Sequence, residues 1–226
     1  TNFTWKVSKT TQYFIRRKKN EDEIQEYFID ECKALKVLPE IKLHVVDTHS
    51  IPLLSTQKPD FVFIQKGKPL DPLNVVAVGE IRTSHNFKNA DIGHAVAFGK
   101  KVLQLQLQRQ YVYAVLTDCI IRIFRGDNNL FSYRYILPEP LTYKTSEPPN
   151  SWKYLVTLVE NSPDQLGWIE PSINFADGNT IKTVTLVRSI SVGRTSIVYE
   201  GTLENNESSV VVKKSKKRTI FTLLYQ

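Results

Sequence analysis

The chain has 226 residues and a formal net charge of +7, with 41% hydrophobic and 23% charged residues. This balance excludes a low-complexity or disordered chain, because enough apolar surface is available for a core in one or two domains. No apolar run approaches a membrane-spanning length and no secretory signal opens the chain, so we expect a soluble protein without a membrane partner. The sequence has no methionine, which indicates a piece of a longer polypeptide.

Cysteine and histidine usage favours a reducing compartment. Cys32 and Cys119 lie far apart in apolar segments, so we expect core residues rather than a disulfide. The four histidines form no pair at the spacing of metal ligands, so a structural zinc site is not expected. The cytosol or the nucleus is therefore the expected location.

The N-terminal half predicts a helix, three strands, a second helix, a strand and a hairpin, in that order. An acidic start followed by apolar residues at helical spacing predicts an amphipathic helix over residues 20–36, and the spacing over residues 91–109 predicts the second helix. Runs rich in β-branched residues between turn formers predict strands at residues 41–46, 60–64, 75–82, 111–116, 120–124 and 130–135.

The C-terminal half has a different pattern of proline and apolar residues. Prolines punctuate residues 137–175, where only residues 152–159 have a regular pattern, so we expect a connector there. Strands are predicted at residues 183–190, 197–199 and 209–213, and the chain stops inside an apolar run, which suggests a truncated second domain. The predicted division is a first domain over residues 1–137, a connector over 138–178 and a second domain over 179–226.

Two carboxylates are expected to meet at adjacent strand ends. Asp60 opens one predicted strand and Glu80 ends the next, where side-chain alternation puts Arg82 on the same face as Glu80 and turns Ile81 into the core. Paired carboxylates bind Mg²⁺, with the carbonyl of Ile81 as a further candidate ligand, and Mg²⁺ supports phosphodiester hydrolysis. Arg82 would orient water or offset charge. The alternative is that Asp60 caps a turn and Glu80 forms an exposed ion pair with Arg82.

The element order and these residues resemble the PD-(D/E)XK, or restriction-endonuclease-like, superfamily over residues 20–125. The resemblance implies an α/β fold with an αβββαβ core and a mixed sheet, and cleavage of DNA that depends on Mg²⁺ or Mn²⁺, with Asp60, Glu80 and Arg82 as the catalytic positions. It also implies that an acidic residue of the first helix joins the metal ligands. Glu23 and Glu26 are the candidates, and Glu23 is nearer to the helix start.

Position 82 departs from the family pattern, which has lysine there. A guanidinium stays protonated, so Arg82 binds phosphate or offsets charge but does not accept a proton. Amines from neighbouring segments are therefore candidates for the family lysine's role: Lys88, Lys100 and Lys101. In several branches a glutamine or lysine of the second helix faces the site, and the candidate equivalents are Gln104, Gln106 and Gln108.

A second resemblance lies near the C-terminus. The segment over residues 191–201, with Gly193, and the later Val-Val-Val-Lys ending at Lys213 resemble the glycine-rich loop and third-strand lysine of protein kinases, although Ser191 and Ser196 replace two glycines. The resemblance implies a truncated, β-rich kinase N-lobe in which Gly193 and Lys213 contact ATP. The other catalytic motifs would lie beyond the chain's end, so ATP is a ligand only of the complete kinase-like domain. The alternative is an ordinary β-hairpin with an exposed lysine-rich edge.

The two resemblances together are similar to the arrangement of Crinkler-type effectors of fungi and oomycetes. This implies DNA as the partner and action in a nucleus, including that of a host cell, with the cytosol as the other location. Basic runs at residues 16–19 and 213–218 suit phosphate contacts, and alternatively form solvated faces or a nuclear-localisation patch.

The leading hypothesis is a Mg²⁺-dependent DNA endonuclease domain of a nuclease-kinase fusion, with Asp60, Glu80 and Glu23 as metal ligands. The alternative is a catalytically degenerate nuclease-like fold that binds DNA or a protein. A third hypothesis is a regulatory module of a protein kinase, in which the proline-rich connector transmits the state of the first domain.

Overall fold

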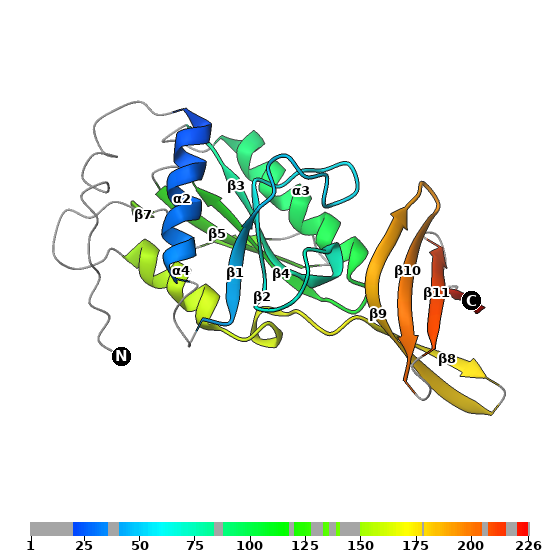
Figure 1. The fold of residues 1–226 in the computed structure, drawn as a ribbon. Helices are drawn as coiled ribbons and strands as arrows, with labels where there is room; N and C mark the ends of the chain where they lie inside the picture. The colour runs from blue at the N-terminus through cyan, green and yellow to red at the C-terminus, as the bar shows by residue number, and fades with distance from the viewer. Residues whose placement is uncertain are drawn as a thin grey trace.

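The chain folds into a layered α/β unit followed by a separate antiparallel sheet (Figure 1). The computed structural model describes residues 20–35, 41–83, 88–117, 120–127, 133–135, 139–140, 150–177, 179–204, 208–215 and 221–225. The basic run at residues 16–19, Cys119, and residues 216–218 of the second basic run lie outside the described residues.

The first sheet is mixed, with seven strands in the order β1-β2-β3-β4-β5-β6 and β7 beside β5. These are β1 (Leu43–Asp47), β2 (Phe61–Gln65), β3 (Val75–Ile81), β4 (Tyr111–Thr117), β5 (Ile120–Asp127), β6 (Tyr133–Tyr135) and β7 (Glu139–Pro140). Neighbours along the sheet are antiparallel except β3 and β4, which are parallel and joined through helix α3 (Asn89–Leu105). A parallel pair needs such a crossover. The prediction of an α/β chain with a mixed sheet is confirmed.

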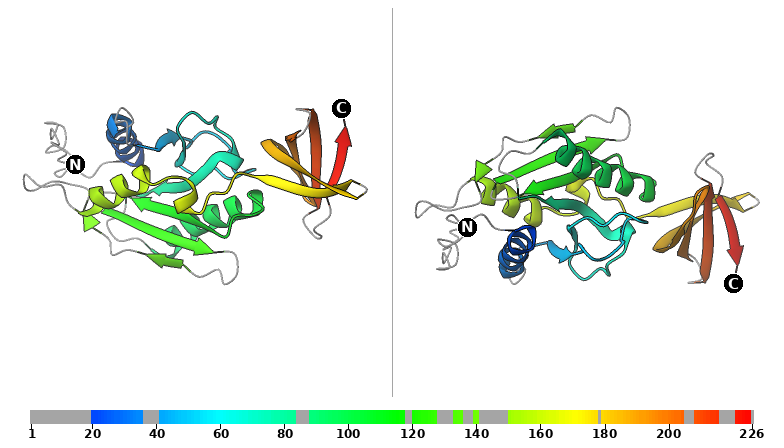
Figure 2. Two further views of the ribbon diagram at one scale, coloured as in Figure 1. Left: turned by 90° about the horizontal axis from the view of Figure 1, so that it is seen from below. Right: turned by 90° about the horizontal axis from the view of Figure 1, so that it is seen from above.

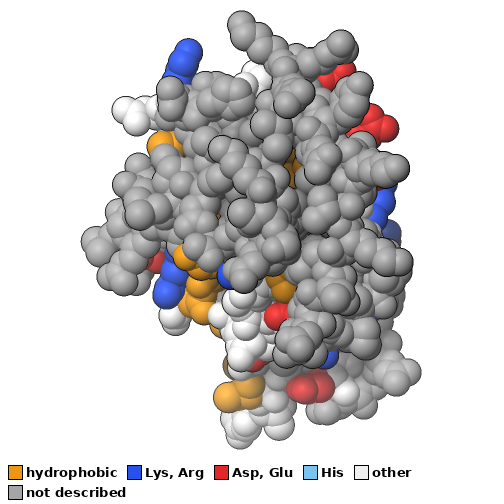
Figure 3. All heavy atoms as spheres, turned by 90° about the vertical axis from the view of Figure 1, so that its left-hand side faces the viewer, with side chains coloured by type: hydrophobic (Ala, Val, Ile, Leu, Met, Phe, Trp, Pro, Cys, Tyr) orange, Lys and Arg blue, Asp and Glu red, His pale blue; other side chains and the backbone are white. Residues whose placement is uncertain are grey.

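Helices cover both faces of this sheet. Ile24 and Phe28 of α2 (Glu21–Leu35) are four residues apart, so they share one helix face, and they join one core with Leu155 of α4 (Asn150–Glu160). Helix α3 packs on the opposite face, where Val102 is buried against Val112. Figure 3 views the side of α2 and α4, where the visible acidic and basic side chains are interspersed. Within the described part of the chain, no helix has the length and apolarity to cross a membrane.

The second sheet has five antiparallel strands in the order β12-β11-β10-β9-β8 and lies beyond the C-terminal end of α3 (Figure 2). The strands are β8 (Ser172–Asp177), β9 (Thr180–Val192), β10 (Ser196–Leu203), β11 (Ser209–Ser215) and β12 (Phe221–Tyr225). Strand β8 falls inside the predicted connector, so that segment contributes a strand as well as α4 and the short 3-10 helix η2 (Asp164–Leu166). The second sheet shares a core with α3, and the Tyr199 hydroxyl donates to the Leu105 carbonyl at 2.9 Å.

Arg109 ties the end of the α3 connection to two strands and to η2. Its side chain is buried, with 1% exposure, and it donates to carbonyls of separate segments. The acceptors are the carbonyl oxygens of Val75 at 2.8 Å, Val76, Tyr111 at 2.7 Å and Leu166 at 3.1 Å, and the side-chain oxygen of Gln106 at 3.0 Å. Burial lowers the pKa of Arg109 to about 9. The five N–H groups of a guanidinium suit this set of acceptors, whereas an ammonium has three.

We expect Arg109→Lys to lower the free energy of unfolding by about 2–4 kcal/mol. The lysine keeps the charge, but one ammonium group cannot replace all of these hydrogen bonds, so the buried acceptors in β3 and η2 lose the Arg109 donor. Urea unfolding followed by circular dichroism measures the change. Arg194→Lys, at an exposed turn, is the matched control and should change the free energy by less than about 0.5 kcal/mol. Equal effects of the two variants would contradict the assignment of Arg109 as a structural junction.

Candidate functional site

The register of β2 and β3 brings Asp60 and Glu80 together. Phe61 pairs with Gly79, so the residues that flank this pair on one side, Asp60 and Glu80, lie opposite each other. The Asp60 backbone N–H donates to the Gly79 carbonyl at 3.1 Å, and the Ile81 backbone N–H donates to Asp60 Oδ2 at 2.6 Å. Two carboxylates therefore share the ends of adjacent strands, as the alternation of strand side chains predicts.

Gly79 makes this register possible because an aromatic ring occupies the space of a side chain. A Cβ atom at position 79 would lie 2.0 Å from ring atoms of Phe61. The Phe61 ring has no room to move, since it is fully buried and its centroid lies 4.7 Å from that of Phe28 on α2. The helix α2 core thus fixes the strand pairing that positions the two carboxylates.

Glu80 is an unusually buried carboxylate. It is 3% exposed, and its Oε2 atom has no hydrogen-bond partner among the described residues. Burial, and secondarily the nearby Asp60 charge, raises the pKa of Glu80 to about 8 although Arg82 acts in the opposite direction. Burial also raises the pKa of Asp60, against the stabilising N–H of Ile81. Without a further cation, the folded protein therefore favours a proton on Glu80 at neutral pH.

Arg82 lies at the centre of the cluster rather than pointing out from it. Its guanidinium pairs with Glu80, with Glu21 of α2 at 3.3 Å and with Asp91 of α3 at 3.3 Å, and it contacts His94 Nδ1 at 3.1 Å. Its side chain is only 20% exposed. Arg82 therefore joins both helices to the strand end and holds Glu80 in place. The alternative prediction was an exposed ion pair between Glu80 and Arg82, but this pair is largely buried.

The helix carboxylate nearest to the cluster is Glu21, two residues before the predicted Glu23. Glu21 contacts Arg82, whereas Glu23 is exposed and uses its backbone N–H to donate to Asn20 Oδ1 at 2.8 Å. Glu26 is also exposed and lines a cavity of about 340 Å³ whose other walls include Gln25, Asp47 and His49. The resemblance pointed to Glu23 or Glu26, but the first residue of the helix, Glu21, is the one that contacts Arg82 at the strand end.

The candidate glutamines and lysines of the α3 region lie elsewhere. Gln106 Nε2 donates to the Pro72 and Val75 carbonyls at 2.8 and 2.7 Å, and Gln108 Nε2 donates to the Ser172 carbonyl at 2.8 Å. Gln104 and Lys101 line a cavity against the second sheet. Of the remaining lysines, Lys88 occupies the position before α3, where its backbone N–H donates to Asp91 Oδ2 at 2.8 Å, and Lys100 is exposed on that helix.

A polar set next to the cluster was not predicted from the sequence. Gln25 of α2 is buried and donates to Asp47 Oδ1 at 2.8 Å and to the Asp60 carbonyl at 3.1 Å. His49 Nδ1 lies 2.6 Å from Asp47 Oδ1, which raises the pKa of His49. The Asp-x-His sequence that ends β1 was the available signal, but its spacing is not that of a metal pair.

The donor set suits one hard divalent cation. Among the residues that the structure describes, no group of three or more His, Cys, Asp or Glu side chains is arranged to hold a metal ion. Mg²⁺ needs only one or two carboxylates because it retains water ligands. Asp60 and Glu80 are two such carboxylates, and the unpartnered Oε2 of Glu80 is a buried acceptor that a cation would satisfy. With Glu21 and Asp91, four carboxylates face the single guanidinium of Arg82.

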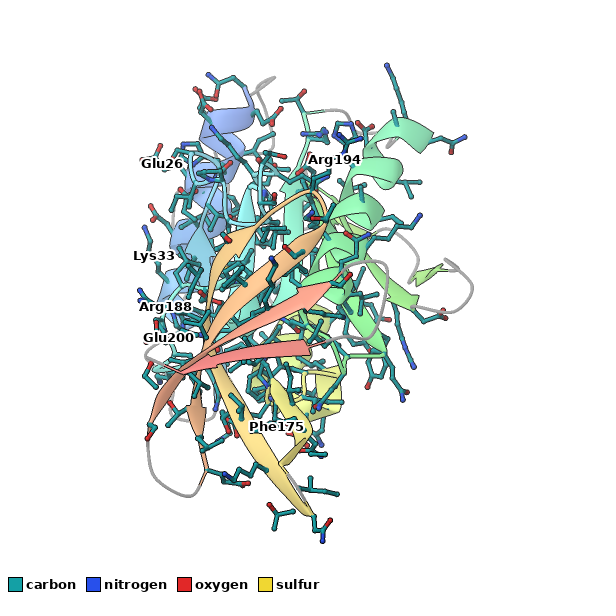
Figure 4. All side chains as sticks on the ribbon, turned by 90° about the vertical axis from the view of Figure 1, so that its right-hand side faces the viewer. Glu26, Lys33, Phe175, Arg188, Arg194 and Glu200 are labelled. Carbon is teal, nitrogen blue, oxygen red and sulfur yellow. The ribbon has the colours of Figure 1, made fainter. Side chains whose placement is uncertain are left out.

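The kinase-like positions lie on the second sheet. Gly193 lies in the exposed turn between β9 and β10, where its N–H donates to the Ser196 carbonyl at 2.9 Å. Lys213 is exposed on β11 and pairs across the strands with Val198. Figure 4 looks onto this sheet and shows Arg188 and Glu200, which form an ion pair between β9 and β10.

Comparisons with known proteins place one family match over the carboxylate cluster. A family model described as a domain of unknown function, DUF6826, matches residues 21–109, the stretch from α2 through α3 to Arg109. No curated protein and no solved structure matches the chain. The matched stretch contains Glu21, Asp60, Glu80 and Arg82, so the cluster and the helices that hold it belong to one matched unit.

We expect Gly79→Ala to lower the free energy of unfolding by about 2–3 kcal/mol, because the added methyl group overlaps the Phe61 ring in a core without free space. Gly93→Ala is the control, since position 93 on α3 has no atom within 4 Å of an added Cβ. It should raise the free energy by about 0.5–1 kcal/mol through helix propensity. Urea unfolding measures both variants, and a neutral Gly79→Ala would contradict the packing assignment.

Glu80 should make the metal-free protein less stable as pH rises. The unfolded chain ionises this carboxyl near its ordinary value of 4.5, whereas the folded protein keeps the proton up to about 8. Between these values the folded state binds more protons, so the free energy of unfolding falls with increasing pH. We expect Glu80→Gln to remove roughly 2–4 kcal/mol of that fall.

Urea unfolding in EDTA between pH 5 and 8.5 measures this dependence. Glu170→Gln is the control because Glu170 is exposed and pairs only loosely with Lys68, at 3.6 Å. It should retain the wild-type slope. A Glu80→Gln protein with the same pH dependence as the wild type would show that Glu80 is ionised throughout this range.

Proposed function

We propose that the chain contains a Mg²⁺-dependent DNA endonuclease domain that hydrolyses phosphodiester bonds, with Mn²⁺ as a substitute ion. The observation that carries this proposal is the buried, unpartnered Oε2 of Glu80 beside Asp60, at adjacent strand ends. A buried carboxylate with a raised pKa next to a second carboxylate is typical of a functional site rather than of a structural ion pair. The proposed partner is DNA, and the proposed location is the nucleus.

The residues divide into ligands and residues that position them. Asp60 and Glu80 would hold the cation, with Glu21 in place of Glu23 as the outer helix carboxylate. When bound, Mg²⁺ supplies charge that activates water and offsets the negative charge of the phosphate. Arg82 donates to Glu80 and to the Ile81 carbonyl at 2.8 Å, so it orients the Glu80 carboxylate and keeps the strand end in place. It accepts no proton in this scheme.

The order of elements supports a restriction-endonuclease-like core. Helix α2, strands β1, β2 and β3, helix α3 and strand β4 follow one another as the αβββαβ unit of that superfamily does, with Asp60 and Glu80 on its second and third strands' ends. The antiparallel β9, β10 and β11 support a kinase N-lobe-like second part, in which Gly193 and Lys213 would meet ATP in the complete domain. A Crinkler-like nuclease-kinase fusion joins the two proposals.

One observation favours a second candidate function, a non-cleaving DNA-binding or regulatory module. Three carboxylates engage Arg82, so the position of the family lysine supplies neither a proton acceptor nor an open cation. A nuclease-like fold that has lost cleavage would retain such a network for its structural value. The two functions differ in one measurable outcome, which is hydrolysis of DNA in the presence of metal.

We expect the purified protein to nick supercoiled plasmid DNA at pH 8 with Mg²⁺ or Mn²⁺ and not with EDTA. Asp60→Asn and Glu80→Gln should each lower the nicking rate at least 100-fold, because each removes a carboxylate that holds the cation. Agarose-gel densitometry measures the rate, and circular dichroism checks that each variant is folded.

Asp30→Asn is the control, because Asp30 lies farther along α2 and forms only an exposed pair with Lys33. It should retain the full rate. Metal-dependent nicking that survives both Asp60→Asn and Glu80→Gln would refute the site. Salt-sensitive DNA binding without nicking in either metal would establish the non-cleaving module instead.

A further inference from the structure

A second cavity lies at the other end of α3 from the carboxylate cluster. It has a volume of about 380 Å³ and is formed between the last turns of α3 and the second sheet. Its lining residues are Lys101, Leu103, Gln104, Leu105, Leu107, Val192, Ile197 and Lys214. Small-molecule sites in proteins are concave, mostly apolar and about 300–1,000 Å³ in size, so this cavity is large enough for a ligand.

The polar groups of the cavity are cationic and come from two elements. Lys101 belongs to α3 and Lys214 to β11. Gln104 adds a side-chain amide one helical turn after Lys101. Among the described residues that line the cavity, none is acidic. Two ammonium groups around one concave space favour an anion, and phosphate is a typical partner of lysine.

The remaining walls are apolar. Leu107 and Val192 are partly buried and present apolar surface to the cavity, whereas Leu105 and Ile197 are already 0% and 2% exposed. Such walls suit the uncharged part of a ligand, because burying that part removes apolar surface from water. A free inorganic ion would leave the accessible parts of Leu107 and Val192 in contact with water, so the cavity fits a molecule with both an anionic and an apolar part.

Lys214 is held in the cavity by strand alternation. Lys213 and Lys214 are neighbours on β11, so their side chains point to opposite faces of the sheet. Lys213 is exposed, whereas Lys214 is half-buried against α3, where burial lowers the pKa of its ammonium group. The cavity is therefore distinct from the face that carries Lys213, and a bound anion would offset the desolvation of Lys214.

We propose that this cavity binds a small organic phosphate, with the phosphate group between Lys101 and Lys214 and the uncharged part against Leu107 and Val192. The concave shape favours a free small molecule over the backbone phosphates of a nucleic-acid duplex, which need an open basic surface. The proposal does not depend on the nuclease assignment, because the two sites share no residue.

Isothermal titration calorimetry with adenosine monophosphate tests the proposal, since this probe joins a phosphate to a flat ring system. Adenosine and inorganic phosphate serve as its two halves, and a short DNA duplex serves as the competing source of phosphate. We expect the whole probe to bind at least tenfold more tightly than either half. All titrations contain EDTA, so that no metal at Asp60 and Glu80 contributes to binding.

Three variants locate the binding. Lys214→Gln should weaken it about tenfold or more, and Gln104→Trp should block it by filling the mouth of the cavity from an exposed position. Lys153→Gln is the matched control, with the same charge change at an exposed position of α4, and it should alter the affinity less than twofold. Circular dichroism verifies the fold of each variant.

Four outcomes would overturn the proposal. The first is the absence of binding by the whole probe, and the second is equal affinity for adenosine alone. The third is an equal loss in Lys153→Gln and Lys214→Gln, which would indicate general surface charge. The fourth is an effect of Lys214→Gln on duplex binding alone, which would assign the lysine to a nucleic-acid surface.

Discussion

The fold depends on one buried cation, Arg109, whose hydrogen bonds join backbone segments rather than balance a charge. Arg109 donates to carbonyls at the start of β3, at the start of β4 and in η2, and so joins a crossover, a parallel strand pair and a distant connector. Without Arg109 the buried Leu166 carbonyl would lose this donor, at a cost of about 1–3 kcal/mol, whereas the Val75 carbonyl would keep the Gln106 side-chain amide. Strand β3 begins at this junction and ends at the carboxylate cluster, so the position of Glu80 follows from a contact made at the opposite end of its strand. Gly79 and the Phe61 ring then set the register that brings Asp60 opposite.

The cluster itself opposes stability. Burial of two neighbouring carboxylates raises the pKa values of both, which means that the fold disfavours their ionised forms. Arg82 reduces this penalty and links α2 and α3 through Glu21 and Asp91, but it leaves Glu80 Oε2 without a partner among the described residues. A purely structural pair would be expected to satisfy both oxygens, because a half-satisfied buried network costs more than an apolar one. The unpartnered Oε2 atom of Glu80, which a cation would satisfy, distinguishes this cluster from an ordinary ion pair.

Periodicity in the sequence predicted most of the secondary structure, whereas individual side-chain roles depended on tertiary contacts. Helix α2 and strands β2 to β5 follow directly from apolar spacing, and strand alternation correctly placed Glu80 with Arg82. Strand β8 was missed because the surrounding prolines indicated a connector. The role of Arg109 was missed because arginine is rarely buried, and no local pattern shows that five acceptors converge on it. Glu21 was overlooked in favour of Glu23 because a tertiary contact decides which residue reaches Arg82. The packing of Phe28 on Phe61 sets the position of the helix axis relative to the strand ends.

Helix α3 connects the two candidate sites mechanically. Its first turns carry Asp91 and His94 against Arg82, and its last turns carry Lys101 and Gln104 against the second sheet. A helix of 17 residues is about 25 Å long and moves largely as a rigid body, since its hydrogen bonds resist bending. Contacts at the cavity therefore bear on the same element that neutralises and orients Arg82. Because the cavity walls come from α3 and the second sheet, a bound molecule would hold the second sheet to α3, the helix whose first turns meet Arg82.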